Sequence, residues 1–189
     1  MNKCFLYEML RTASPSGQEF DLQKKVINYM RNQCHEVRTD LTGNVISVLN
    51  PESPVRVLLA GHIDEIALMV TMVTSDGLLK VTNVGGVRPA LYLGQKVRIL
   101  TEKGMIKGIV GVNKELLKNK EISCTDLFID LGVNTKEEAL ALVELGNLVI
   151  IDTDFEELSH SRIAGRAMDN RVGAFIVIEA LRRARELGA

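Results

Sequence analysis

The chain has 189 residues, of which 23 are basic and 24 acidic, giving a formal net charge of −1 at neutral pH. This balance excludes the general attraction to phosphate typical of nucleic-acid-binding proteins, so no nucleic-acid partner is expected. Apolar residues make up 46% of the sequence, but no apolar run approaches the roughly 20 residues of a membrane helix, and no membrane partner is expected. The first residues lack a signal-peptide cleavage site, which predicts a cytoplasmic location.

Helical and extended patterns alternate in the first third of the chain. Apolar residues recur at helical spacing in residues 2–12 and in residues 18–32. Residues 36–50 have the pattern of two strands joined by a glycine-bearing turn. Residues 55–62, VRVLLAGH, form a nearly continuous apolar run that predicts a central strand buried on both faces.

The pattern changes between residues 66 and 160, where short alternating strands are separated by glycine-bearing turns. Helices are predicted only at about residues 114–118 and 135–145, and Thr135 with Glu138 fits a capping box at the start of the second. This segment is therefore predicted to form a small β-rich barrel or sandwich.

Helical character returns in the last part of the chain and places Asp169 in the loop or first turn before a core helix. The predicted fold class is α/β. Residues 1–65 and 161–189 are expected to form an incomplete peptidase-type α/β sheet domain, and residues 66–160 a barrel-like inserted domain.

An imidazole and two carboxylates stand in the apolar stretch LLAGHIDEIALMV, residues 58–70. His62 and Asp64 would share one face of a strand, roughly 6.5 Å apart at their α-carbons. In that position a carboxylate can bind the second imidazole nitrogen and orient the ring toward a metal. The alternative is a His and an Asp that cap a strand end at the surface. Glu65 is interpreted as a strand-edge charge that faces water.

Asp169 is the second candidate ligand. An Asp near a helix start is also a common N-cap, and Arg171 would then pair with a nearby carboxylate.

Several motifs together connect these residues to a known family. The chain resembles the M42 family of metallo-aminopeptidases, which includes glutamyl aminopeptidases, tetrahedral aminopeptidases and proteins misnamed as endoglucanases. The matching segments, in the family's order, are SPSGQE, DLTGNVIS, LLAGHIDEIALMV, VGGVRPALYLGQKVRI, KGMIKGIVG, DLFIDLGV, TKEEA and AGRAMDNRVG.

The resemblance implies a hydrolase with two divalent metal ions, zinc or cobalt with manganese possible, that removes N-terminal residues from peptide substrates. His62 would bind one ion and Asp169 would bridge both, while Asp64 would have the catalytic role of orienting His62. The family also implies a cis peptide bond after the bridging carboxylate, here Asp169–Asn170, and homo-oligomers from dimers to dodecamers. Asn170 replaces the commoner Asp.

The family's remaining groups, a Glu-Glu pair, an Asp and a distal His, do not occur in these 189 residues. His35 and His160 are expected at the surface, so the chain alone is expected to be close to inactive. The favoured interpretation is an N-terminal piece of a longer protein, ahead of a degraded product or a genuine half that binds another chain. The alternatives for function are a non-catalytic assembly protein derived from the peptidase and another two-metal hydrolase, such as a deacylase or carboxypeptidase.

Overall fold

A computed structural model describes residues 2–118 and 121–188 of the chain. The chain divides into two compact units, residues 1–65 with 154–189 and residues 66–153. The predicted insert therefore extends too far, because residues 154–160 belong to the first unit. The reason is a side-chain contact within that unit, where the ring of Phe155 stacks on Tyr7 with the ring centroids 4.2 Å apart.

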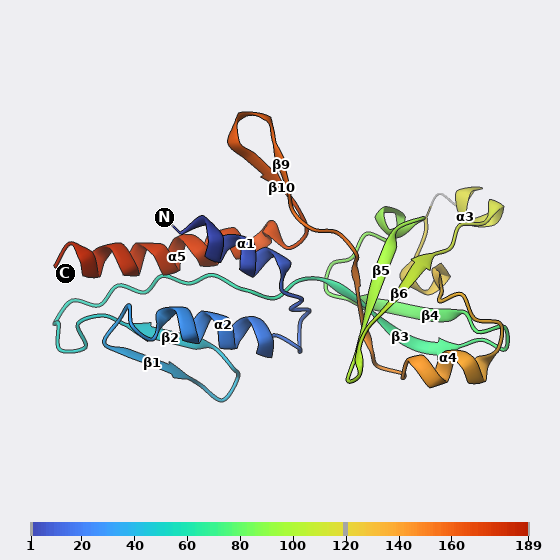
Figure 1. Cartoon of the computed structure of the whole chain (residues 1–189), viewed down its shortest axis with the longest axis horizontal. Helices are drawn as coiled ribbons and strands as arrows, with labels where there is room; N and C mark the ends of the chain where they lie inside the picture. Colours follow the sequence, from blue (N-terminus) through green and yellow to red (C-terminus); the bar gives the residue numbers. More distant parts are fainter. Residues whose placement is uncertain (1, 119–120, 189) are drawn as a thin grey trace. The chain divides into compact units, whose positions relative to one another are not determined.

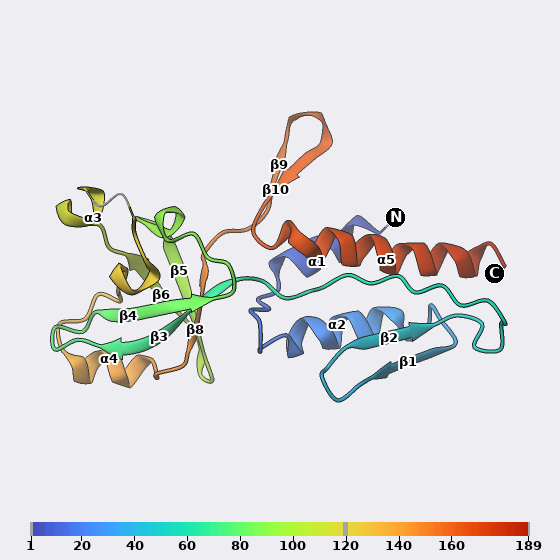
Figure 2. The same cartoon turned by 180° about the vertical axis from the view of Figure 1, so that it is seen from behind.

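Three helices dominate the first unit, and all three were predicted. Their bounds are Lys3–Arg11 for α1, Phe20–Met30 for α2 and Met168–Glu186 for α5. The helices α1 and α5 lie side by side (Figures 1 and 2). The buried residues of the three helices form a common core: Phe5, Met9, Leu22, Val26, Met30, Ala174, Phe175 and Ile178.

The strands of the first unit form two separate antiparallel ribbons. One pairs β1 (Glu36–Thr39) with β2 (Val45–Val48), as predicted. The other pairs β9 (Glu156–Leu158) with β10 (Arg162–Ala164) and projects from the unit in Figure 1.

The β1–β2 turn is held by the carboxylate of Asp40, which accepts hydrogen bonds from the backbone and side chain of both Asn44 and Thr42. The Asn44 side chain is the largest cause that lowers the pKa of Asp40, from 3.8 to about 2. A lowered folded-state pKa stabilises the fold above the unfolded value, and that contribution is lost as the pH falls through about 2.

We therefore expect NMR of the Asp40 side-chain carboxyl to give a titration midpoint near 2, and the Asn44→Ala variant to raise it. A midpoint near 3.8 in the unaltered chain would show that the turn is not formed in solution.

The prediction of a buried central strand at residues 55–62 is wrong for this structure. Residues 55–64 have no strand assignment and run as an extended segment between α5 and α2 (Figures 1 and 2). Leu58 is 89% exposed and Val57 81% exposed. A strand is stabilised by ladder hydrogen bonds to neighbours, and within the described residues no strand pairs with this segment.

The second unit is a closed antiparallel barrel, with strand order β3-β4-β7-β6-β5-β8. The strand bounds are Ala67–Val73 (β3), Leu79–Val84 (β4), Lys96–Thr101 (β5), Gly104–Val110 (β6), Phe128–Asp130 (β7) and Leu148–Ile151 (β8). Closure removes the free edges that an open sheet would expose. The predicted barrel-like unit is thus confirmed as part of a mixed α/β fold.

Helices in the second unit follow the sequence signals closely. The helix α3 spans Lys114–Lys118 and α4 spans Lys136–Leu142. The predicted capping box is formed at α4, where the Thr135 side chain accepts from the Glu138 backbone N–H and the Glu138 carboxylate accepts from the Thr135 N–H. Single 3₁₀ turns occur at Pro89–Tyr92, Cys124–Asp126 and, in the first unit, Ser159–Ser161. Over the described residues, no helix is both long enough and apolar enough to cross a membrane.

Candidate metal site

His62 and Asp64 lie at the end of the extended segment and are in direct contact. The Nδ1 atom of His62 is 2.8 Å from Oδ1 of Asp64. The other carboxylate oxygen of Asp64 accepts a hydrogen bond from the hydroxyl of Ser16. The contact expected between the imidazole and the carboxylate is therefore formed, although the segment has no ladder partner.

The environment of Asp64 determines which nitrogen of the His62 imidazole carries the proton. The Ser16 hydroxyl is the largest cause that lowers the pKa of Asp64, and His62 lowers it further, while partial burial opposes both. An ionised carboxylate can only accept hydrogen bonds, so Nδ1 of His62 carries the proton that they share. In a neutral imidazole the Nε2 atom then presents its lone pair.

Asp169 stands at the start of α5, where the backbone departs from helical geometry. The residues Asp169 and Asn170 have non-helical dihedral angles, and the peptide bond between them is cis, as expected. The Asp169 side chain is 97% exposed, and its Oδ1 atom lies 3.4 Å from Nε2 of the 56% exposed His62. The structure thus brings together two residues that are 107 positions apart in the sequence (169 minus 62).

The donor pair fits part of a divalent metal site. In a tetrahedral zinc site with ligand distances of about 2.0–2.1 Å, two ligand atoms lie roughly 3.4 Å apart. The observed separation of Nε2 and Oδ1 is 3.4 Å. The pair is open to solvent, so an ion and further ligands can reach it.

These two residues do not make a complete site. Within residues 2–118 and 121–188, no group of three or more His, Cys, Asp or Glu side chains is placed to hold a metal ion. His35 and His160 are exposed, as predicted, and the Nδ1 atom of His35 accepts a hydrogen bond from the Asn50 N–H. A catalytic zinc takes three protein ligands, so at least one further protein ligand is needed besides His62 and Asp169.

Glu65 is buried, and its interpretation as a strand-edge charge facing water is wrong. Its side chain is only 4% exposed and contacts two arginines. Nη2 of Arg171 donates to Oε1 at 2.8 Å, and Nη1 of Arg166 donates to both oxygens, at 2.5 Å to Oε2. The backbone N–H of Ser14 also donates to Oε1, at 3.0 Å. Burial of a carboxylate is tolerated here because it is paired and hydrogen-bonded.

Arg171 is fully buried, and the predicted pairing with a carboxylate is confirmed. Besides Glu65, its guanidinium donates to the backbone oxygens of Met9 at 2.8 Å and Leu10 at 3.2 Å, in the last turn of α1, and of Ile63 at 3.2 Å. Burial lowers the pKa of Arg171, and the charge of Glu65 opposes that shift.

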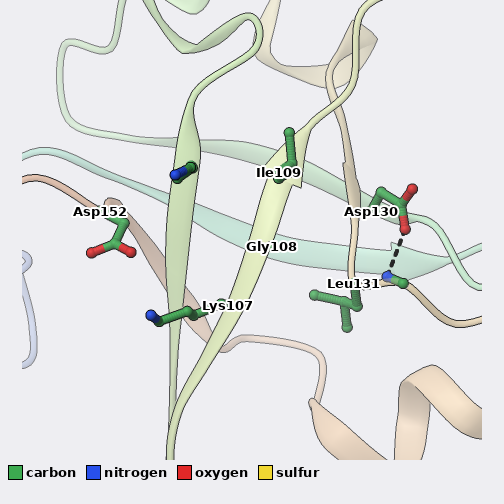
Figure 3. Close-up of a pocket in the computed structure, with 8 residues that line it drawn as sticks. Lys107, Gly108, Ile109, Asp130, Leu131 and Asp152 are labelled. Carbon is green, nitrogen blue, oxygen red and sulfur yellow. Dashed lines mark hydrogen bonds between the residues drawn. The ribbon is translucent and has the colours of Figure 1, made fainter.

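A shallow hollow of about 480 Å³ lies on the barrel of the second unit and is drawn in Figure 3. None of the predicted site residues lines it. Its two carboxylates are already engaged, since Asp130 accepts from the backbone N–H of Gly132 at 2.7 Å and Asp152 pairs with Arg98 at 2.5 Å.

The sequence pattern shared by the M42 glutamyl aminopeptidase family matches residues 43–188. The chain belongs to the M42 family. It is 32% identical to the lysyl aminopeptidase of Pyrococcus furiosus over 189 aligned residues, which cover 96% of this chain and 54% of that protein.

Solved structures agree with the M42 assignment. A TET aminopeptidase from a marine sediment archaeon of the Thaumarchaeota superposes with a TM-score of 0.90 at 30% identity, covering 98% of this chain and 54% of that one. The TET1 peptidase of Pyrococcus horikoshii, described as assembling into a tetrahedron or a large octahedral shell, gives 0.84 at 31% identity, covering 96% and 56%. The chain spans about half the length of the relatives it matches.

The sequence did not predict three residues that make contacts around His62 and Asp169. They are Ser16, which binds Asp64, and Glu65 and Arg166, which bind each other. Signals were present: Ser16 lies in the motif SPSGQE, and Arg166 and Arg171 flank Asp169 at three residues before and two after. These signals do not show which residues are in contact, because the contacting residues are 48 to 106 positions apart in the sequence.

Proposed function

We propose that this chain contributes part of the dinuclear metal site of an aminopeptidase. His62 would hold one ion through Nε2 and Asp169 would be shared by two ions, while Asp64 keeps His62 in the tautomer that presents Nε2. The observation that supports this assignment is the 3.4 Å separation of Nε2 and Oδ1 in a member of the M42 family. In this assignment, residues 1–65 and 154–189 belong to the peptidase domain and residues 66–153 to the inserted domain.

When bound, the two divalent ions supply Lewis-acid polarisation of the scissile carbonyl and hold the free amine of the peptide. The residues of this chain position that chemistry. Asp64 keeps the proton on Nδ1 of His62 and limits rotation of the ring, and Ser16 in turn fixes Asp64. Asp169 would supply the negative charge that offsets the charge of the ions.

Zinc or cobalt suits an imidazole and carboxylate set, and manganese also accepts it. Because two ligands cannot complete a catalytic site, we propose that the other donors come from protein outside residues 1–189 and that this chain alone does not turn over peptides. The assemblies formed by TET relatives support a homo-oligomer.

A chimera tests the reaction type. Residues 1–189 are fused to the part of the Pyrococcus furiosus lysyl aminopeptidase that the alignment leaves uncovered. With cobalt added, the chimera is expected to release p-nitroaniline from aminoacyl-p-nitroanilides but not from their N-acetylated forms. The His62→Ala and Asp169→Asn variants of the chimera are expected to lose this activity.

Other outcomes would favour the alternatives. Cleavage of N-acetylated substrates would favour a deacylase or carboxypeptidase. A folded chimera whose oligomer forms normally, and whose properties do not respond to metal or to the two variants, would favour a non-catalytic assembly protein.

A further inference from the structure

We infer that Glu65 is the positioning residue that sets the separation between His62 and Asp169, with Arg171 and Arg166 as its two partners. This inference rests on the proposed function of His62 and Asp169 as metal ligands. Glu65 lies three residues after His62, and neither Glu65 nor its partners touches a reacting group in this proposal.

The segment that carries His62 is anchored to residues 14–16 by hydrogen bonds. The backbone N–H of Glu65 donates to the oxygen of Ser14 at 2.9 Å, and the N–H of Ser16 donates to the oxygen of Glu65 at 3.2 Å. The Ser14 hydroxyl donates to the oxygen of Ile63, the residue after His62, at 3.0 Å. Residues 63–65 are therefore held along residues 14–16.

The segment that carries Asp169 is attached to Glu65 by two arginines. Arg166 precedes Asp169 by three residues and Arg171 follows it by two, and both guanidinium groups bind the Glu65 carboxylate. One buried carboxylate thus holds the chain on both sides of Asp169. Displacement of this loop relative to Glu65 would require breaking two charge-assisted contacts in a site sheltered from water.

A third contact links the two segments directly. Nε of Arg171 donates to the backbone oxygen of Ile63 at 3.2 Å. The cluster of Glu65, Arg166 and Arg171 has two arginines for one carboxylate. The guanidinium of Arg171 also donates to the backbone oxygens of Met9 and Leu10 at the C-terminal end of α1, where the helix dipole is negative. The carboxylate of Glu65 is therefore bound by Arg166, Arg171 and the backbone of Ser14 without a hydrogen bond from the cluster to Asp64 or Asp169.

The competing explanation is that the cluster only stabilises the fold, and Glu179 supplies the matched control. Glu179 is buried to the same degree as Glu65, 5% against 6% exposed. It accepts from Arg182 at 3.2 Å and from the Tyr29 hydroxyl at 2.7 Å, and it lies ten residues after Asp169 on α5 (179 minus 169). Both Glu→Gln variants remove a buried charge, but only Glu65→Gln acts on the contacts between the ligand segments.

Cobalt titration of the 189-residue chain, followed by visible absorption, separates the two explanations. We expect Glu65→Gln to weaken cobalt affinity about 10- to 100-fold, the range measured when outer groups that orient metal ligands are removed. Glu179→Gln is expected to lower thermal stability but leave cobalt affinity unchanged. Equal affinities for Glu65→Gln and the unaltered chain would overturn the inference. If Glu65→Gln does not fold, the Arg166→Gln variant replaces it in the titration, because it removes one partner of Glu65 and keeps Arg171. Arg166→Gln is also expected to weaken cobalt affinity.

A metal-free crystal structure of the Glu65→Gln or Arg166→Gln variant gives an independent result. The separation of Nε2 of His62 and Oδ1 of Asp169 is expected to widen beyond about 4 Å, the limit for an ion-pair contact. A separation that stays at 3.4 Å would overturn the positioning role. Failure of the unaltered chain to bind cobalt would instead contradict the proposed function. The positioning role of Glu65 would then be decided by the distance between Nε2 of His62 and Oδ1 of Asp169 in the crystal structures of the variants.

Discussion

Replacing Arg171 with methionine is expected to lower the free energy of unfolding of the first unit by about 3–5 kcal/mol, the cost of breaking a buried ion pair by removing one partner. The guanidinium is fully buried and donates to Glu65 and to three backbone oxygens, of Met9, Leu10 and Ile63. Methionine fills much of the same volume but removes all of these hydrogen bonds, and it leaves Arg166 as the charged partner of the buried Glu65 carboxylate. Urea denaturation followed by far-UV circular dichroism measures the loss.

Two comparisons make this prediction specific. Arg183→Met, at an exposed position on the same helix, is expected to change stability by less than about 0.5 kcal/mol. In a double-mutant cycle, Glu65→Gln and Arg171→Met are expected to be non-additive, because each removes the same contact. Additive effects, or a loss for Arg171→Met no larger than that for Arg183→Met, would contradict the role of the buried cluster.

A single added methyl group at Gly61 is expected to destabilise the first unit by about 1–3 kcal/mol, the usual cost of overpacking. A Cβ atom at this position would lie 2.8 Å from both Cα and N of Ala174, which are backbone atoms of α5. Neither can move aside without displacing the helix. Since Gly61 precedes His62 and Asp169 begins α5, Gly61→Ala is also expected to weaken metal binding. Thermal unfolding and cobalt titration of the variant measure the two effects.

Gly86→Ala is the matched substitution, because a Cβ there would meet no atom within 4 Å and the backbone is not left-handed. It is expected to be neutral or slightly stabilising. If Gly61→Ala unfolds at the same temperature as the unaltered chain, the close approach between residue 61 and α5 does not exist in solution.

Local signals in the sequence predicted the elements that depend on local interactions. The helices α1, α2 and α5, the β1–β2 hairpin and the Thr135–Glu138 capping box were predicted because each is specified by spacing, turn or cap residues within a few positions. The apolar run at residues 55–62 was misread because a buried strand requires neighbours. The same pattern without partners leaves Leu58 exposed.

In the candidate site too, the features set by neighbouring residues were predicted and those set by distant residues were not. The contact between His62 and Asp64 follows from their spacing of two residues, and the position of Asp169 at the start of a helix follows from the pattern after it. The motif resemblance was needed to associate these segments with each other. The burial of Glu65 was missed because its arginine partners lie more than 100 residues away, and no local rule distinguishes a paired Glu from a solvated one.

The claim that His62 and Asp169 share a metal ion is tested most directly by isothermal titration calorimetry of zinc into the 189-residue chain and its variants. The account predicts zinc binding in the unaltered chain that is lost in both His62→Ala and Asp169→Asn. Binding should be retained in His160→Ala, which removes an exposed imidazole from the tip of the β9–β10 ribbon. Zinc binding that survives His62→Ala or Asp169→Asn, or that is absent from the unaltered chain, would contradict it.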